Sequence, residues 1–233
     1  MKFTNYLRPA WVLAAAGWGA QLSAATPDFT GVWQAVSPPS ALKTVEGKLP
    51  PLLPEAAQLY QQRVAARKAG DIGFDDTAKC QPPGLPRAYF MGMPFEIQQE
   101  ANTLYVLFQW NRLFRAVDIG ISHDQQNMYA PTYFGFATGS WDKDALVIDS
   151  QLFNDMTLLD AAGLPHSMDM QVVERWALDK QGSTIQATFT IEDAQFYAAP
   201  WSFKATFKRM PSGTEIQEDV CLERMGAVKR LVR

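Results

Sequence analysis

Short segments that alternate apolar and polar residues, separated by turn residues, dominate the chain from residue 95 onward. Such alternation is typical of strands with one buried face, and the segments are rich in Val, Ile, Phe, Tyr and Trp. Strands are predicted at 28–33, 95–99, 103–110, 113–119, 133–138, 145–150, 171–178, 184–192, 201–209 and 214–221. Tight-turn residues at 180–182 and 211–213 join neighbouring strands. This meander order predicts an all-β domain, either an antiparallel calycin-like barrel or a β-sandwich of about nine strands.

The segment between the first two predicted strands departs from this pattern. A helix is predicted at 55–69, because Pro54 occupies its first turn and Gly70 can end it. Leu59, Tyr60 and Val64 would form its apolar face. Residues 71–94 are rich in Pro and Gly and are predicted to form a long loop. With 233 residues, 47% of them hydrophobic, the chain suits one β-rich domain at 26–233 with an insertion at about 54–94.

The first 25 residues resemble a secretory signal peptide. Lys2 and Arg8 supply positive charge, an apolar run covers 9–20, and small residues precede a cleavage point after Ala25. A membrane anchor is the alternative, but the run falls short of the ~20 residues that span a bilayer. We therefore expect a periplasmic or secreted protein without a stable membrane anchor. The 21 basic and 24 acidic residues are scattered, so no nucleic-acid partner is expected.

Cys80 and Cys221 are the two cysteines of the chain. In an oxidising compartment, two cysteines without a third most simply form one disulfide. It would tie the early loop to the last predicted strand and close a loop of about 140 residues. Neither cysteine has a histidine nearby, so a metal site is not predicted there.

The triplet Gly31-Val32-Trp33 is reminiscent of the Gly-x-Trp opening of lipocalins and related calycin barrels. There the Trp closes one end of the barrel and a basic side chain from a late strand packs on it. Lys208 or Arg209 is the expected cation–π partner here. This resemblance concerns the fold alone.

Several longer motifs together resemble an uncharacterised family of exported bacterial proteins. They are DFTGVW at 28–33, CQPPGLPR at 80–87, GSWDKDALVID at 139–149 and PHSMDMQVVERW at 165–176. The resemblance extends over nearly all of 26–233 and implies export, but no reaction. The turn at 142–145 departs from the family pattern, which has Gly and Thr where this chain has Lys143 and Ala145.

A polar loop at 154–167 follows one of the predicted strands and contains His166. Histidine titrates near neutral pH, and a carboxylate such as Asp155 or Asp169 would orient its ring. With Tyr133 or Arg87 polarising a substrate oxygen, this set predicts a cofactor-independent isomerase, dehydratase or lyase. The alternative is structural: Asp155 would cap a short helix at 157–160 that Gly163 ends.

Other reaction classes have weaker support in the sequence. No G-x-S-x-G motif occurs, and Ser167 is adjacent to His166, which is poor geometry for a nucleophile and its base. His123 and Asp124 would have to meet His166 to bind a metal, and their spacing matches no metal motif.

A glycosidase needs two facing carboxylates, and Glu174, Glu192 and Asp193 are the residues available. No spacing distinguishes them from the other acids. Glu174 and Arg175 lie in a predicted strand, where a cross-strand ion pair is the simpler expectation.

Aromatic residues are dense for a β domain, and some lie in loops where they serve no predicted strand. We expect a loop flap over a cavity and a ligand site formed by Tyr89, Phe90, Met91, Trp110, Phe134, Trp141 and Phe153. The leading hypothesis is therefore an exported protein that binds a hydrophobic small molecule, such as a lipid, steroid or aromatic, within a β-barrel. The enzyme with His166 in the same cavity is the alternative, and a structural envelope protein is the third. None of these requires a cofactor.

Overall fold

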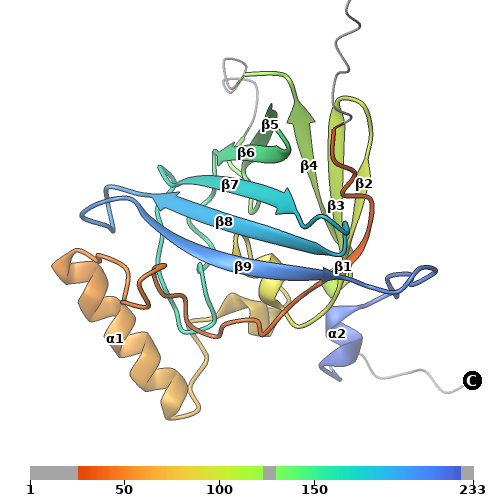
Figure 1. Ribbon diagram of the computed structural model, residues 1–233. Helices are drawn as coiled ribbons and strands as arrows, with labels where there is room; N and C mark the ends of the chain where they lie inside the picture. The colour runs from red at the N-terminus through yellow and green to blue at the C-terminus, as the bar shows by residue number, and fades with distance from the viewer. Residues whose placement is uncertain (1–25, 123–129, 227–233) are drawn as a thin grey trace, which may run out of the picture.

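Nine strands form a closed barrel in sequence order from β1 to β9 (Figure 1). The computed structural model describes residues 26–122 and 130–226, so the predicted signal peptide lies outside the described residues. The strands are β1 (Gly31–Ala35), β2 (Phe95–Gln99), β3 (Thr103–Phe108), β4 (Leu113–Ile119), β5 (Phe136–Asp142), β6 (Ala145–Gln151), β7 (Gln171–Leu178), β8 (Thr184–Glu192) and β9 (Trp201–Arg209). The prediction of an all-β barrel is confirmed, and the sandwich alternative is wrong.

One strand pair corrects the expectation of an antiparallel barrel. β4 and β5 run parallel, with Asp118 opposite Thr138, whereas every other neighbouring pair is antiparallel. A parallel pair needs a crossover connection of about a dozen residues or more, and residues 120–135, which separate β4 from β5 in the sequence, provide that length.

The barrel closes between β1 and β9. Trp33 lies opposite Arg209 in this pairing, and the guanidinium carbon of Arg209 is 4.3 Å from the centroid of the Trp33 ring. The Trp33 indole donates to the carbonyl of Phe29, and Arg209 Nε donates to the carbonyl of Gly182. Of the two cations considered, Arg209 is the one that packs on Trp33.

The helical segments are α1 (Pro54–Lys68), η1 (Asp76–Lys79), η2 (Arg87–Phe90), η3 (Trp110–Arg112) and α2 (Cys221–Arg224). α1 begins at Pro54 and buries Ala56 and Tyr60, but Val64 is 40% exposed and does not belong to the buried face. The predicted strand at 214–221 is wrong. Because β9 already pairs with β1, no free sheet edge remains for it; residues 214–220 are irregular and α2 begins at Cys221. Within the described ranges, no helix has the length and apolar character needed to cross a bilayer.

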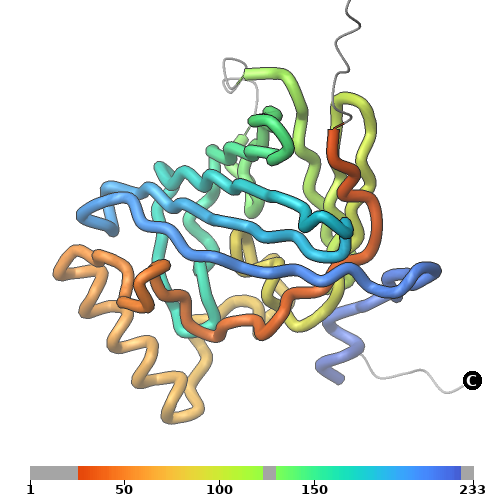
Figure 2. Tube along the Cα trace, in the orientation of Figure 1, coloured from red at the N-terminus to blue at the C-terminus, as the bar shows by residue number. Residues whose placement is uncertain are grey.

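A disulfide joins Cys80 to Cys221, as predicted, with their Cα atoms 5.7 Å apart. It ties the loop after η1 to α2, not to a last strand. The segment 36–53 runs beside β9 (Figure 2). Val36 and Val45 donate backbone hydrogen bonds to Thr206 and Ser202 of that strand.

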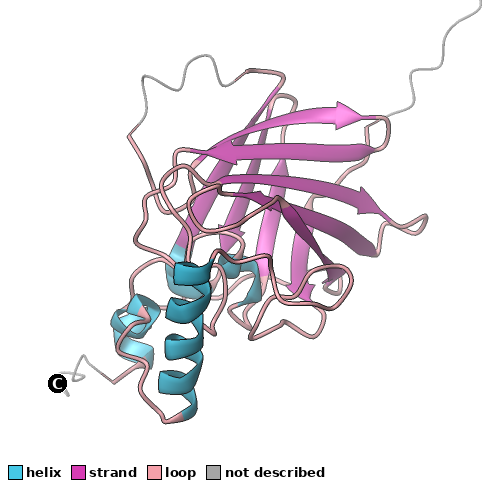
Figure 3. Cartoon of the chain, turned by 90° about the vertical axis from the view of Figure 1, so that its left-hand side faces the viewer, coloured by secondary structure: helices cyan, strands magenta, loops and turns pink. Residues whose placement is uncertain are grey.

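The connections between strands differ at the two ends of the barrel. At one end, short turns join β2 to β3, β5 to β6 and β7 to β8. At the other end, the long segments 36–94, 152–170 and 193–200 connect β1 to β2, β6 to β7 and β8 to β9. Figure 3 shows α1 lying beyond the strands at this second end, which we call the loop-rich end.

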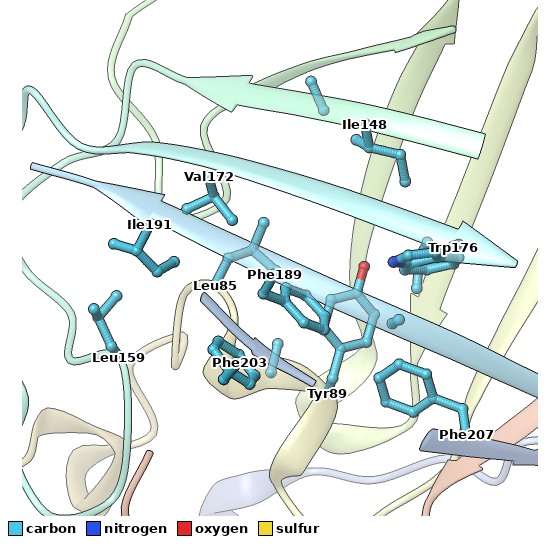
Figure 4. Close-up of a cluster of buried hydrophobic side chains, with 14 of the residues drawn as sticks. Leu85, Tyr89, Ile148, Leu159, Val172, Trp176, Phe189, Ile191, Phe203 and Phe207 are labelled. Atoms are coloured by element: carbon cyan, nitrogen blue, oxygen red, sulfur yellow. The ribbon is translucent and has the colours of Figure 1, made fainter. Parts of the chain in front are cut away.

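Aromatic side chains fill the interior of the barrel (Figure 4). Tyr89 of η2 is fully buried there, with its ring 5.8 Å from Phe189, 5.5 Å from Phe207 and 5.6 Å from Trp176. The loop residues around Tyr89 were expected to cover a cavity as a flap. In the structure, Tyr89 itself inserts into the core.

A charged pair also lies inside the barrel. Nη1 of Arg115 is 2.7 Å from Oε1 of Glu174, and Arg115 also donates to Tyr89 Oη and Ser150 Oγ. A cross-strand ion pair was expected at Glu174 and Arg175, and each residue pairs with a residue of another strand, on opposite faces because adjacent strand residues point to opposite sides. Arg175 faces outward and pairs with Asp142 at 2.7 Å.

Candidate functional site

A cavity of about 460 Å³ opens at the loop-rich end of the barrel. One wall comes from α1 and the segment 74–77, and the opposite walls come from 155–158, 165–168 and 195–196. Its lining residues are Leu59, Arg63, Phe74, Asp75, Asp76, Thr77, Pro82, Pro83, Arg87, Asp155, Met156, Thr157, Leu158, Pro165, His166, Ser167, Met168, Gln195 and Phe196. We call this cavity the mouth pocket.

His166 is 4% exposed and both of its ring nitrogens have partners. Nδ1 lies 3.0 Å from the carbonyl oxygen of Ser167, and Nε2 lies 2.6 Å from Oγ1 of Thr157. Because a carbonyl can only accept, Nδ1 carries the proton, and the hydroxyl of Thr157 donates to Nε2. Burial lowers the pKa of His166, although the Ser167 carbonyl and the carboxylates of Asp193 and Asp155 oppose this. The imidazole is therefore neutral at pH 7 and able to accept a proton.

A buried acid fixes the backbone that carries His166. Asp193 accepts from the amide of Ser167 at 2.6 Å and from its hydroxyl at 2.9 Å. The hydroxyl of Tyr197 donates to the carbonyl of Pro165 at 2.7 Å. The ring of Phe153 approaches His166 edge to face, with centroids 6.3 Å apart. These contacts on both sides of His166 hold its ring in one orientation.

Thr157 is placed by the close approach of a glycine. A Cβ atom at Gly84 would lie 2.8 Å from the Cβ of Thr157 and closer still to its hydroxyl. Gly84 also has a φ of +69°, which favours glycine. The segment that follows the disulfide therefore packs directly against the partner of His166.

Arg87 is held in the pocket wall by Asp75. Its two terminal nitrogens donate to the two carboxylate oxygens of Asp75 at 2.8 and 2.7 Å, and Arg67 donates to the same carboxylate at 2.6 Å. Burial acts to raise the pKa of Asp75, but the hydrogen bonds and charge of Arg87, together with those from Thr77, lower it overall. Asp75 is thus a stable anion at neutral pH, and the Arg87 guanidinium is fixed in a bidentate pair.

Three of the four residues expected to be catalytic line this pocket, namely His166, Asp155 and Arg87. Asp155 was expected to orient the histidine, but Thr157 and Ser167 occupy the ring nitrogens instead. The fourth residue, Tyr133, lies beside the pocket. Its hydroxyl donates to Gln81 at 2.9 Å and is 4.0 Å from Sδ of Met156, a lining residue.

Sequence reasoning missed Thr157, because no periodicity links it to His166 within an irregular loop. The helix expected at 157–160 does not form. Asp160 organises this loop instead, because its carboxylate accepts from the amides of Leu42, Gly163 and Leu164.

The aromatic residues expected to bind a ligand do not gather around one cavity. Most pack on other side chains: Tyr89 and Phe153 in the core, Phe134 on Phe108, Trp141 on Phe29 and Trp110 on Arg224. Phe90 and Met91 line a second cavity of about 260 Å³, which shares Arg87 with the mouth pocket. A ligand-binding role for these residues stays a prediction.

The three carboxylates considered for a glycosidase lie in three different environments and do not face one another across a cavity. Glu174 is inside the barrel, Asp193 supports Ser167, and Glu192 is exposed. Among the described residues, no three His, Cys, Asp or Glu side chains are arranged to hold a metal ion. His123 and Asp124 lie outside the described residues.

The mouth pocket combines a neutral imidazole, a hydroxyl donating to it and two guanidinium groups, beside apolar side chains. Such an arrangement can bind a small organic molecule and move a proton to or from it. A scan against models of protein families and a search of curated proteins both found no match to this chain.

Proposed function

We propose that this protein binds a small organic molecule in the mouth pocket and acts on it by proton transfer through Thr157 and His166. The observation that carries this proposal is the 2.6 Å contact between Thr157 Oγ1 and His166 Nε2 in the wall of that pocket. A neutral, oriented imidazole is a competent general base near pH 7. The reaction class is a cofactor-independent isomerisation, dehydration or lyase reaction.

The proposed step begins with the loss of a proton from the substrate. Thr157 Oγ1 accepts this proton and passes its own to His166 Nε2, so that Thr157 stays neutral and His166 becomes an imidazolium. Asp193 and Asp155 favour that charged form. Return of the proton to another substrate carbon completes an isomerisation, and its transfer to a departing hydroxyl completes a dehydration.

A carrier of hydrophobic molecules is the second candidate, and the apolar side chains of the pocket favour it. Met156 and Met168 are 55% and 48% exposed, and Phe74 and Phe196 lie on the same pocket. Methionine adapts its shape to varied apolar ligands. Binding inside the barrel stays a prediction, and it would require Tyr89 to leave the aromatic core.

The structural envelope protein is the third candidate. The filled interior of the barrel is compatible with a structural role. A structural role does not explain the pocket lined by ionisable groups. For every candidate we propose a periplasmic or secreted location after cleavage of the first 25 residues. The disulfide between Cys80 and Cys221 is compatible with an oxidising compartment.

The experiment is a thermal-shift screen of small organic molecules on wild type, His166→Gln and Thr157→Val, followed by mass spectrometry of each hit after incubation. Arg175→Gln is the control, because Arg175 pairs with Asp142 on the outer face of the barrel. We expect hits that stabilise all four proteins by mass action but are converted only by wild type and the control. Hits that bind to all four and are converted by none would establish the carrier. A screen without hits would contradict both.

A further inference from the structure

Arg63 of α1 is one of the residues that line the mouth pocket. Nη1 donates to the carbonyl of Gly163 at 2.9 Å, and the guanidinium carbon is 6.0 Å from the centroid of the Phe74 ring. A guanidinium has five N–H donors in a planar fork, and the contact with Gly163 uses one of them. Most of the hydrogen-bonding capacity of Arg63 is therefore left for another partner.

The other basic residues around the pocket already take part in ion pairs. Arg67 and Arg87 share the carboxylate of Asp75, and Lys79 pairs with Asp76 at 2.7 Å. No ion pair involves Arg63 within residues 26–122 and 130–226. Arg63 is thus a cation in the pocket wall without an anionic partner among the residues that the structure describes.

Partial burial makes this unpaired charge significant. Burial lowers the pKa of Arg63, which shows that its environment disfavours the cation, although arginine stays protonated at neutral pH. Asp155 is the opposite charge on another wall, but it is exposed and therefore screened by solvent. The Nε–H of Arg87, which is buried in the wall, likewise has no acceptor among the described residues.

We infer that the ligand of the mouth pocket is an organic acid whose carboxylate pairs with Arg63 and whose apolar body lies along Phe74 and Met168. The planar fork of a guanidinium matches two carboxylate oxygens, and such charge-assisted pairs are stronger than neutral hydrogen bonds. A cavity of about 460 Å³ has the size of a small-molecule site. This inference rests on the proposed function, because it names the substrate class of the same pocket.

The test compares acids with their uncharged amides. The probes are 3-phenylpropanoate and hexanoate, each beside the corresponding primary amide, and the readouts are thermal shift and titration calorimetry. The proteins are wild type, Arg63→Gln, Arg63→Lys, His166→Gln and Arg175→Gln. The last variant removes one exposed arginine from the outer face and so matches the change in net charge.

We expect at least one acid to bind wild type and Arg175→Gln with similar affinity, while His166→Gln reports whether binding also depends on the proposed base. Arg63→Gln should bind it about tenfold more weakly or worse, because a charge-assisted pair is lost. The affinity of Arg63→Lys for the acid should be intermediate, since lysine keeps the charge but lacks the planar guanidinium. This variant also tests the inference if Arg63→Gln does not fold. The amide should bind wild type, both Arg63 variants and Arg175→Gln with similar affinity.

Two results would overturn the inference. Either neither acid binds wild type, or an acid binds Arg63→Gln and Arg63→Lys as well as wild type. Conversion of an uncharged compound that depends on His166 would in that case leave the proposed function standing. Loss of acid binding in the Arg63 variants without any conversion by wild type would support the acid site and count against the proposed reaction.

Discussion

Gly84 lies so close to Thr157 that a Cβ atom on Gly84 would come within 2.8 Å of the Cβ of Thr157. The two residues belong to different connections of the loop-rich end, and their contact fixes where the hydroxyl that meets His166 can lie. The first prediction tests this contact.

Gly84→Ala should lower the free energy of unfolding by about 2–4 kcal/mol, because it combines a clash with Thr157 and strain at positive φ. Gly182→Ala is the matched control. Gly182 has a φ of +66°, close to the +69° of Gly84, but a Cβ there would meet nothing within 4 Å. The free energy of unfolding of the control should therefore fall by only about 1 kcal/mol, the cost of backbone strain at positive φ. Equal losses in urea denaturation would show that the contact with Thr157 is unimportant.

Thr157→Val should remove the hydrogen bond to His166 while keeping the shape of the side chain. Because His166 Nε2 is buried and would lose its donor, we expect a loss of about 1–3 kcal/mol in unfolding free energy. Thr157→Ser keeps the hydroxyl and should lose less. NMR of the imidazole nitrogens should show a changed Nε2 environment in Thr157→Val and a nearly unchanged one in Thr157→Ser. Similar spectra for both variants would contradict the assigned tautomer.

The lowered pKa of His166 predicts a pH dependence of stability. Its folded pKa lies below the ordinary value of 6.5, so the unfolded chain binds this proton first as the pH falls. The unfolding free energy of wild type should therefore decrease relative to that of His166→Gln as the pH falls from about 6.5 to the folded pKa, and then change no further. Above pH 6.5 the difference should be constant.

Denaturation of both proteins at a series of pH values from 8 to 5 measures this difference. Burial raises the pKa values of Asp160 and Glu174, so these groups change the unfolding free energy with pH in the opposite direction. Wild type and His166→Gln share these contributions, which therefore cancel in the difference. A difference that stays constant down to pH 5, or a gain in the stability of wild type relative to His166→Gln as the pH falls, would contradict the burial of a neutral His166.

Local signals made much of the fold predictable. Alternating residues gave most of the strands, and Pro54 marked the start of α1. The resemblance of Gly31-Val32-Trp33 to the opening of lipocalins indicated Lys208 or Arg209 as the partner of Trp33, and Arg209 is the residue that packs on it. The disulfide followed from the presence of two cysteines.

The remaining features depend on how distant segments meet. The parallel pairing of β4 and β5 was missed because the sequence between these strands has no periodicity that would indicate a crossover. Tyr89 was assigned to a flap because a loop sequence does not show which way its side chains point. The contact between Thr157 and His166 needs a loop held by hydrogen bonds to Asp160 and Asp193, and the sequence does not predict either set of hydrogen bonds. His166 itself stood out as one of only two histidines.

Adjacent residues on β7 provide a direct comparison of a buried and an exposed ion pair. Glu174 is fully buried against Arg115, whose terminal nitrogens also donate to Tyr89 and Ser150. Neither carboxylate oxygen of Glu174 has a hydrogen bond of good geometry, so charge is the main interaction between the two side chains. Arg175, the next residue, pairs with Asp142 at the surface.

Glu174→Gln should therefore cost about 3–5 kcal/mol of unfolding free energy, because it leaves the charge of Arg115 buried without compensation. Asp142→Asn breaks the exposed pair and should cost at most about 1 kcal/mol. Replacing both members of the buried pair, with Arg115→Met and Glu174→Leu, should recover much of the loss, since no buried charge then remains. Urea denaturation of the four proteins measures these differences. If the double variant were no more stable than Glu174→Gln, the penalty would have to come from packing around Tyr89 and not from the unpaired charge of Arg115.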